Sequence, residues 1–217
     1  MNMNPSLGLE RLYGFFQKRD SERWHGLDES YFNGLTPIER NQAWNFILSS
    51  SRLSDERIRG LFLLDSNRAI YLFKEICLGP IEESDFPAER KAFERARLAL
   101  LHYINLVQPT SEHMNKMCSF ALSNFKEIRT IFATSVPEKV TTPAILNALK
   151  SMIFTEADEM ALSSAVMKFM AIYGMEFDAD DKDYKVIYNS LRSGGGSEKL
   201  AAIKRLEKIS SPILFSY

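Results

Sequence analysis

Apolar residues recur at three- and four-residue spacing along most of the chain, with a helix start or stop signal about every 15 to 25 residues. The longest uninterrupted pattern covers residues 86–107. One helical face there carries Ala92, Ala96, Ala99, Leu100, Tyr103 and Val107. Leu98, Leu101 and Ile104 make the opposite flank apolar as well. We therefore expect one long helix, buried nearly all round, with other helices packed on at least two of its sides.

The same spacing, together with capping residues, predicts about eleven helices. A clear start is Thr36-Pro37-Ile38-Glu39, because Thr36 can cap, proline suits the first helical position and Glu39 completes a capping box. The expected segments are 7–16, 36–48, 54–64, 65–76, 84–107, 110–122, 124–132, 142–153, 155–173, 181–191 and 197–209. No stretch shows the sustained alternation of a strand, so the predicted fold class is all-α.

The length of 217 residues fits one domain with a substantial core. We predict a single all-α domain over residues 1–217, with an N-terminal helix and connection in 1–35 and a helical body in 36–193. Gly194-Gly195-Gly196 has the composition of a linker, followed by a last helix within 197–217. Connections of about two to six residues between short helices favour antiparallel α-α hairpins.

Two segments resemble each other, Asp55–Leu64 and Phe125–Ala133. Both place an apolar residue and an arginine near a helix start, as Ile58-Arg59 and Ile128-Arg129, before an apolar stripe. This pattern resembles the inner helix of HEAT-type repeats. The resemblance implies an α-solenoid of stacked hairpins, and the alternative is an irregular helical bundle without true repeats.

Composition narrows the class of protein. Hydrophobic residues make up 45% and charged residues 25%, which argues against disorder. A net charge of -1 lacks the basic field of a nucleic-acid binder, and no apolar run approaches the ~18 residues that span a bilayer. With only Cys77 and Cys118, and no secretory pattern in Met-Asn-Met-Asn-Pro-Ser, we expect a cytoplasmic protein with free thiols.

The sequence shows no set of residues for catalysis. The three histidines, His25, His102 and His113, are far apart, and none has the H-E-x-x-H spacing of a zinc site. Gly194–Gly196 lacks the Lys-Ser/Thr and the preceding strand of a phosphate-binding loop. We therefore expect no catalytic residue, no cofactor and no metal, and a protein that is not an enzyme.

The strongest charge cluster runs from residue 176 to 183 and holds five acids against one base, Glu176, Asp178, Asp180, Asp181 and Asp183 against Lys182. A calcium loop is disfavoured, because the glycine at its sixth position and the glutamate at its twelfth are missing. The favoured interpretation is a solvated helix N-terminus capped by aspartate. As candidate contacts for a basic partner we name Asp178, Asp180, Asp181 and Asp183.

Aromatic residues stand in the polar connection over residues 21–34. One interpretation is that Trp24, Tyr31 and Phe32 fold back and hold the first two helices together. The other is that they anchor a partner, since tryptophan and tyrosine are enriched at binding hot spots. Trp24 and Tyr31 are therefore further candidate contacts.

The family resemblance also suggests a function. Small, near-neutral HEAT-like proteins include bacterial immunity proteins that neutralise a cognate toxin, and Gly60-Leu-Phe-Leu-Leu-Asp65 after Leu35-Thr-Pro-Ile-Glu39 is similar to those proteins. The resemblance implies a non-catalytic inhibitor of a toxin or effector with a basic surface. The alternatives are a HEAT-like DNA glycosylase, against which the net charge weighs, and a scaffold or regulatory subunit.

Overall fold

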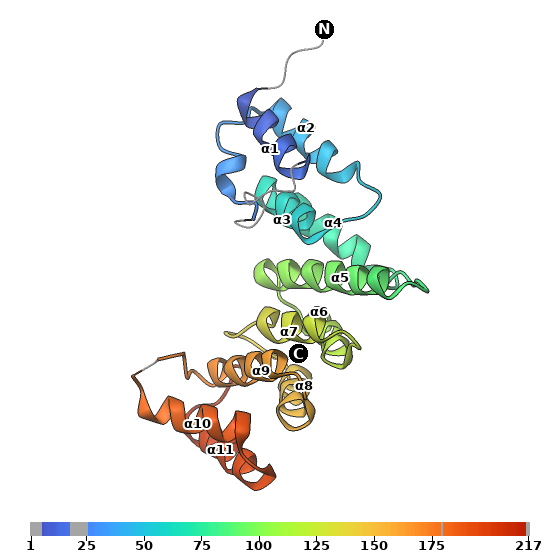
Figure 1. The fold of residues 1–217 in the computed structure, drawn as a ribbon. Helices are drawn as coiled ribbons and strands as arrows, with labels where there is room; N and C mark the ends of the chain where they lie inside the picture. The colour runs from blue at the N-terminus through green and yellow to red at the C-terminus, as the bar shows by residue number, and fades with distance from the viewer. Residues whose placement is uncertain (1–5, 18–25, 179, 216–217) are drawn as a thin grey trace. The chain divides into compact units, whose positions relative to one another are not determined.

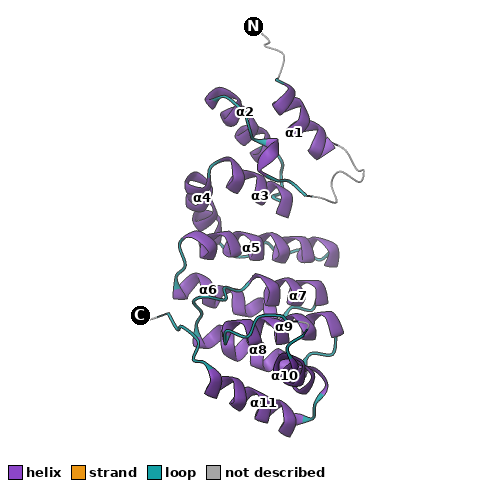
Figure 2. Ribbon diagram, turned by 90° about the vertical axis from the view of Figure 1, so that its left-hand side faces the viewer, coloured by secondary structure: helices purple, strands orange, loops and turns teal. Residues whose placement is uncertain are grey.

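The computed structural model describes residues 6–17, 26–178 and 180–215, and this part of the chain is helical with no strand (Figures 1 and 2). The predicted all-α class is confirmed. The helices are α1 (Leu7–Gln17), η2 (Glu29–Tyr31, a 3-10 helix), α2 (Pro37–Leu48), α3 (Asp55–Leu64), α4 (Ser66–Leu78), α5 (Pro87–Val107), α6 (Ser111–Met117), η3 (Cys118–Leu122, a 3-10 helix), α7 (Lys126–Ser135), α8 (Pro143–Thr155), α9 (Glu159–Ile172), α10 (Lys182–Ser193) and α11 (Gly196–Ile209).

The chain forms two compact units, Met1–Pro80 and Ile81–Tyr217. The division follows Gly79-Pro80, where the sequence indicates only the end of a helix. It coincides with neither of the internal boundaries expected near residues 35 and 194. A single domain over residues 1–217 stays a prediction. In the first unit α2 packs on α1 and on α3, and α3 packs on α4.

In the second unit α7 lies between α5 and α9 and contacts both (Figures 1 and 2). Its buried side chains, Ile128, Phe132 and Ala133, are fully shielded from solvent. The helix α8 contacts α6, η3, α9 and α11, and α10 contacts α9 and α11. The core of this unit is therefore built largely from contacts with the next helix but one, as in α5 with α7, α6 with α8 and α7 with α9.

Helix starts follow the capping signals. Thr36 and Glu39 form the predicted capping box, with Thr36 Oγ1 accepting from Glu39 N at 3.3 Å and Glu39 Oε2 accepting from Thr36 N at 2.8 Å. The other side chains that cap as expected are Ser54, Asp65, Thr110, Thr142 and Asp181. Local hydrogen bonding thus sets most helix starts, and these predictions are confirmed. The start expected at Thr155 is wrong, because Thr155 ends α8 and Asp158 caps α9, which begins at Glu159.

Two more helices differ from expectation. The segment 110–122 is not one helix, because α6 ends at Met117 and the chain continues as the 3-10 helix η3. The last helix begins at Gly196 with Gly195 at its cap, so Ser197 does not cap it. The Gly195 N–H is satisfied by Glu198 Oε2 at 2.8 Å, and Gly194 directly follows α10. In the structure these glycines form a tight turn between two packed helices.

The long helix α5 exists as predicted, but its buried face differs. Leu98, Leu101 and Ile104 are at most 1% exposed, whereas Ala92 and Val107 of the expected face are exposed. The helix is also not buried all round, since Leu106 is 61% exposed. The larger leucine and isoleucine side chains bury more apolar area than the alanine stripe, which explains why they face the core.

The segment after α11 folds back on the start of α8. Thr141 N donates to Ile213 O at 3.0 Å and Phe215 N donates to Thr141 O at 2.9 Å, around an isolated parallel bridge between Thr141 and Leu214. These bonds tie residues 213–215 to the connection between α7 and α8.

The start of α8 makes a first prediction. Thr142 is 1% exposed, and its Oγ1 accepts from Ile145 N at 3.3 Å and donates to Asn115 Oδ1 at 2.7 Å. Thr142→Val keeps the shape but removes both bonds, so we expect unfolding free energy to fall by about 1–2 kcal/mol. Urea unfolding followed by circular dichroism measures this. Thr142→Ser keeps the hydroxyl and is the control; equal losses in the two variants would contradict the capping role.

Candidate functional site

The connection between α9 and α10 holds the predicted acidic cluster. Asp181 Oδ1 accepts from the N–H groups of Asp183 at 2.7 Å and Tyr184 at 3.2 Å, and so caps α10. Asp178 Oδ1 accepts from Asp180 N at 2.8 Å, while Asp183 pairs with Arg205 of α11 at 3.0 Å. Among the described residues, no three His, Cys, Asp or Glu side chains are placed to hold a metal ion. The acids are thus arranged as helix caps and solvated carboxylates.

Gly174, which follows the end of α9, sets the direction in which the chain leaves this helix. Gly174 has a φ of +77°, its N–H donates to Ala171 O at 2.8 Å, and Met175 N donates to Met170 O at 3.0 Å. A residue in the left-handed region closes the helix, which is strongly favourable only for glycine. The chain reverses here, and the residues that follow are presented to solvent between α9 and α10.

An open pocket of about 560 Å³ lies beside these acids. Phe177, which is 73% exposed, and Ile209, which is 56% exposed, both line it. The ring of Phe177 meets that of Tyr184 edge-on at 5.5 Å. We call the group Glu176, Phe177, Asp178, Asp180, Asp181 and Ile209 the acidic surface. It combines carboxylates with exposed apolar side chains. The sequence placed all four acids in one charge cluster, but only the aspartates were named there as candidate contacts.

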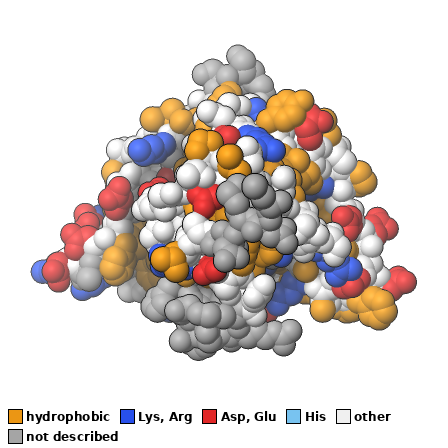
Figure 3. Space-filling view, turned by 90° about the horizontal axis from the view of Figure 1, so that it is seen from above, with side chains coloured by type: hydrophobic (Ala, Val, Ile, Leu, Met, Phe, Trp, Pro, Cys, Tyr) orange, Lys and Arg blue, Asp and Glu red, His pale blue; other side chains and the backbone are white. Residues whose placement is uncertain are grey.

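Within the described parts of the chain, Glu176, Asp178 and Asp180 make no ion pair, and all three residues are exposed. Their charge is therefore uncompensated at short range. On the face drawn in Figure 3, acidic and basic side chains lie among apolar ones. Among the described residues, Glu82, Glu83 and Asp85 form a second group of exposed acids without an ion pair, so the acidic surface is distinguished by the open pocket beside its acids.

The aromatic candidates lie in the other unit. Trp24 falls outside the described residues. Tyr31 in η2 is 8% exposed, its ring meets Phe15 of α1 edge-on at 5.3 Å, and the guanidinium of Arg11 lies 4.2 Å from its ring centroid. Tyr31 thus packs back onto α1, and only a small part of it is accessible. Its role as a partner contact stays a prediction.

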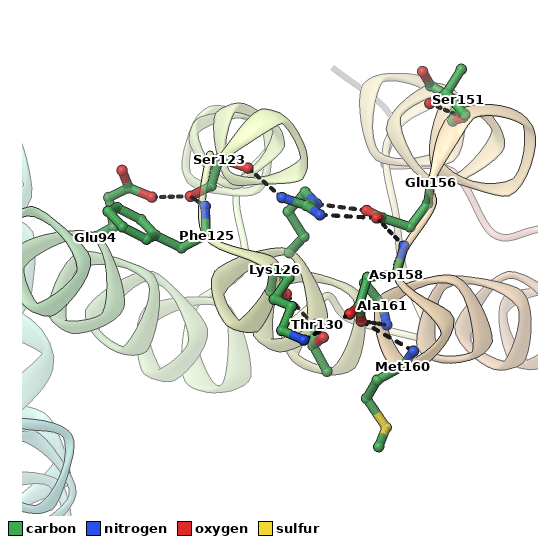
Figure 4. A network of polar contacts seen from close by, with 12 residues as sticks. Glu94, Ser123, Phe125, Lys126, Thr130, Ser151, Glu156, Asp158, Met160 and Ala161 are labelled. Atoms are coloured by element: carbon green, nitrogen blue, oxygen red, sulfur yellow. Dashed lines mark hydrogen bonds and ion pairs between the residues drawn. The ribbon is translucent and has the colours of Figure 1, made fainter. Parts of the chain in front are cut away.

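A buried ion pair in the second unit was not foreseen from the sequence (Figure 4). Arg129 of α7 binds Glu156 through two bonds, Nε to Oε2 at 2.6 Å and Nη2 to Oε1 at 2.9 Å. The side chains are 19% and 5% exposed. The guanidinium holds the pKa of Glu156 below its ordinary value, and the hydrogen bonds that Arg129 donates to this carboxylate raise the pKa of Arg129. Such bidentate pairs are strong and geometrically specific.

The same pair connects several elements. Arg129 Nη1 donates to Ser123 O at 2.8 Å, and Glu156 Oε1 accepts from Asp158 N at 2.8 Å. Asp158 in turn caps α9 and pairs with Lys126 at 3.2 Å (Figure 4). The network joins η3, α7 and the connection between α8 and α9. Its partners satisfy one another, which is typical of a structural role.

A second open pocket, of about 540 Å³, borders this network and includes Cys118. Burial raises the pKa of the Cys118 thiol to about 11, so the thiol is protonated at neutral pH and is a poor nucleophile. His102 and His113 lie at hydrogen-bond distance from Ser135 O and Thr110 Oγ1 respectively, and His25 lies outside the described residues. These contacts position the two imidazole rings.

No helix in the described part of the chain has the length and apolarity to cross a membrane. Comparison with protein-family models, with curated proteins and with solved structures finds no match in any of the three.

Proposed function

We propose that this chain is a non-catalytic protein-binding module whose acidic surface binds a basic patch on a partner protein. The observation that carries the proposal is the exposed ring of Phe177 between the unpaired carboxylates of Glu176 and Asp178. An aromatic anchor within a ring of one charge sign suits an interface, because the charges steer association and the ring supplies buried apolar area.

The packing of the second unit supports a HEAT-like array as its scaffold. Contacts between alternate helices run from α5 to α7 to α9 and from α6 to α8, and α8 also contacts α11. Contacts between alternate helices are expected in a two-layer solenoid of stacked hairpins. In an irregular bundle, such a series would not be required. The array would hold the connection between α9 and α10 on a rigid support.

Within this class we propose an inhibitor that neutralises a toxin or effector. The support is the resemblance to HEAT-like immunity proteins together with the sign of the acidic surface. A toxin that acts on an anionic substrate needs a basic active surface, and carboxylates that cover this surface would block the substrate. Inhibition would then require binding alone and no turnover.

The test starts from the partner, which is captured from the native cell with the purified chain and identified. Its association rate is then measured against the wild type and against Glu176→Gln/Asp178→Asn/Asp180→Asn. We expect this triple variant to associate about tenfold more slowly at low salt, because it removes the steering charges. At high salt the difference should shrink, since screening weakens exposed charges.

A matched control removes the same charge elsewhere in the second unit. Glu82, Glu83 and Asp85 are also exposed, and Glu82→Gln/Glu83→Gln/Asp85→Asn should associate like the wild type. Equal slowing in both triple variants would show a nonspecific effect of net charge and would overturn the proposed surface. Capture of nucleic acid in place of a protein, with a steep salt dependence, would overturn the function itself.

A further inference from the structure

The helix α11 buries one face against α8 and α10 and exposes the other. On the exposed face Lys204 and Lys208 lie one helical turn apart. Lys182, at the start of α10, is exposed as well. Within the described part of the chain these three lysines make no ion pair, so their charge is uncompensated at short range.

The three lysines belong to one surface, because α10 and α11 lie side by side (Figures 1 and 2). The ion pair between Asp183, in the first turn of α10, and Arg205 of α11 brings Lys182 beside the second half of α11. We call Lys182, Lys204, Arg205 and Lys208 the basic face.

The basic face and the acidic surface share a border. Lys182 follows Asp181 in the chain, Lys208 precedes Ile209, and Asp181 and Ile209 line the same open pocket. The three unpaired carboxylates of the acidic surface therefore lie next to the three unpaired lysines. Adjacent patches of opposite sign complement a second copy of the same surface related by a two-fold axis, because each patch then meets its opposite.

Apolar side chains stand at this border. Phe177 is 73% exposed and Ile209 is 56% exposed, and both line the pocket beside the acids. A polar outer face alone would suit the last hairpin of a stacked array, which meets solvent. Two exposed apolar side chains between patches of opposite sign suit a contact that buries them.

We propose that two copies of this chain pair through the end of the second unit formed by α10 and α11, with the acidic surface of each copy on the basic face of the other. The contact is small, so the dimer is weak and reversible. Pairing requires no other protein and so goes beyond the function proposed above, although a partner with a basic patch competes with the second copy for the acidic surface. Far below its dissociation constant the dimer is apart, so the tests of pairing and of partner binding succeed or fail independently.

Sedimentation velocity of the purified full chain tests the pairing. At low salt we expect a monomer at low concentration and a growing share of dimer as the concentration rises. At high salt the dimer should be at least about tenfold weaker, because screening weakens exposed charges. A wild type that stays monomeric at every concentration would overturn the inference, whether or not its basic face binds a DNA duplex or anionic vesicles.

Two charge-reversed variants locate the contact. The acid-reversed variant carries Glu176→Lys/Asp178→Lys/Asp180→Lys, and the base-reversed variant carries Lys182→Glu/Lys204→Glu/Lys208→Glu. Each variant alone should pair at least about tenfold more weakly than the wild type, because like charges then face each other. Mixed in equal amounts, the two variants should form a heterodimer, since each patch again meets its opposite.

The matched control, Glu82→Lys/Glu83→Lys/Asp85→Lys, makes the same change in net charge at exposed acids elsewhere in the second unit. It should pair with itself like the wild type and form no such heterodimer with the base-reversed variant. The inference is overturned if the reversed variants pair with themselves like the wild type, or if their mixture stays monomeric.

A measurement on the wild type decides the matter if a reversed variant fails to fold. Isotope-labelled and unlabelled chains are mixed and cross-linked with a carbodiimide, which joins lysines to carboxylates in direct contact. Cross-links from Lys204 or Lys208 of one copy to Glu176 or Asp178 of the other support the pairing. Their absence from the cross-linked dimer would overturn it.

Discussion

Replacing Arg129 by methionine is expected to lower the free energy of unfolding of the second unit by about 2–3 kcal/mol, less than for a fully buried pair because both residues line an open pocket. The substitution leaves the carboxylate of Glu156, 5% exposed, without the guanidinium that binds it through two bonds. It also removes the donor to Ser123 O. An uncompensated buried charge is among the most destabilising changes available to a core. Urea unfolding followed by circular dichroism measures the loss.

Two further variants separate this mechanism from a general loss of packing. Arg129→Met/Glu156→Leu replaces both charges by apolar groups and should recover much of the stability. Lys150→Met breaks the more exposed pair with Glu207, whose side chains are 32% and 41% exposed, and should cost only about 0–1 kcal/mol. If the double variant were as unstable as the single one, the buried charge would not be the cause.

The pH dependence of stability tests the same pair. The pKa of Glu156 is depressed in the folded state, mainly by its hydrogen bonds with Arg129. Its contribution is therefore fully present above the unfolded pKa of about 4.3 and is lost as pH falls through the lower folded pKa. Between neutral and acid pH, the wild type should lose more stability than Arg129→Met/Glu156→Leu.

The second large effect is expected at Gly194. A Cβ atom there would lie 2.4 Å from Ser190 O and 2.9 Å from Glu198 Cβ, so the turn between α10 and α11 would have to shift. Gly194→Ala should therefore cost about 2–3 kcal/mol, which is the range of overpacking. Its φ of -72° is open to any residue, so the effect is steric and does not arise from backbone strain. Thermal unfolding measures it.

Gly196, two residues further along, supplies the control. A Cβ at Gly196 meets nothing within 4 Å, and this residue is the first of α11. Alanine is a better helix former than glycine, so Gly196→Ala should be neutral or stabilising by up to ~1 kcal/mol. A similar loss in both alanine variants would mean that the turn requires flexibility at each position, in contradiction to the proposed close approach.

The helices were predictable because their signals are local. Thr36, Asp65 and Thr142 satisfy N–H groups within three residues of themselves, so the sequence alone contains both partners. The buried face of α5 was not predictable in the same way. Which stripe of that helix is covered depends on α6 and α7, whose approach is a tertiary feature.

The residues of the acidic surface also differ in whether local sequence predicts them. The aspartates of the acidic surface are adjacent in sequence and were recognised, whereas Ile209 reaches the pocket only through the turn that joins α10 to α11. Phe177 had one signal, an apolar residue among acids just beyond the glycine that ends α9. Because Phe177 lies between α9 and α10, it belongs to no apolar face of a helix.

The two arginines that suggested internal similarity have different surroundings. Arg129 is bound in the buried pair, but Arg59 is exposed. In α3 it is Arg57 that reaches the end of the preceding helix, with Nη1 donating to Phe46 O at 3.2 Å and Ile47 O at 2.5 Å. Burial lowers the pKa of this guanidinium. The Ile-Arg pairs that match in the sequence therefore do not place their arginines in the same structural role.

The pairing of residues 213–215 with Thr141 closes the intervening chain into a loop that contains α8 to α11. Fraying from the side of α11 must break the bonds at Thr141 before it can spread, so these helices should open as one cooperative event and not turn by turn. Amide hydrogen exchange would show this as similar protection for the N–H groups of Thr141 and Phe215.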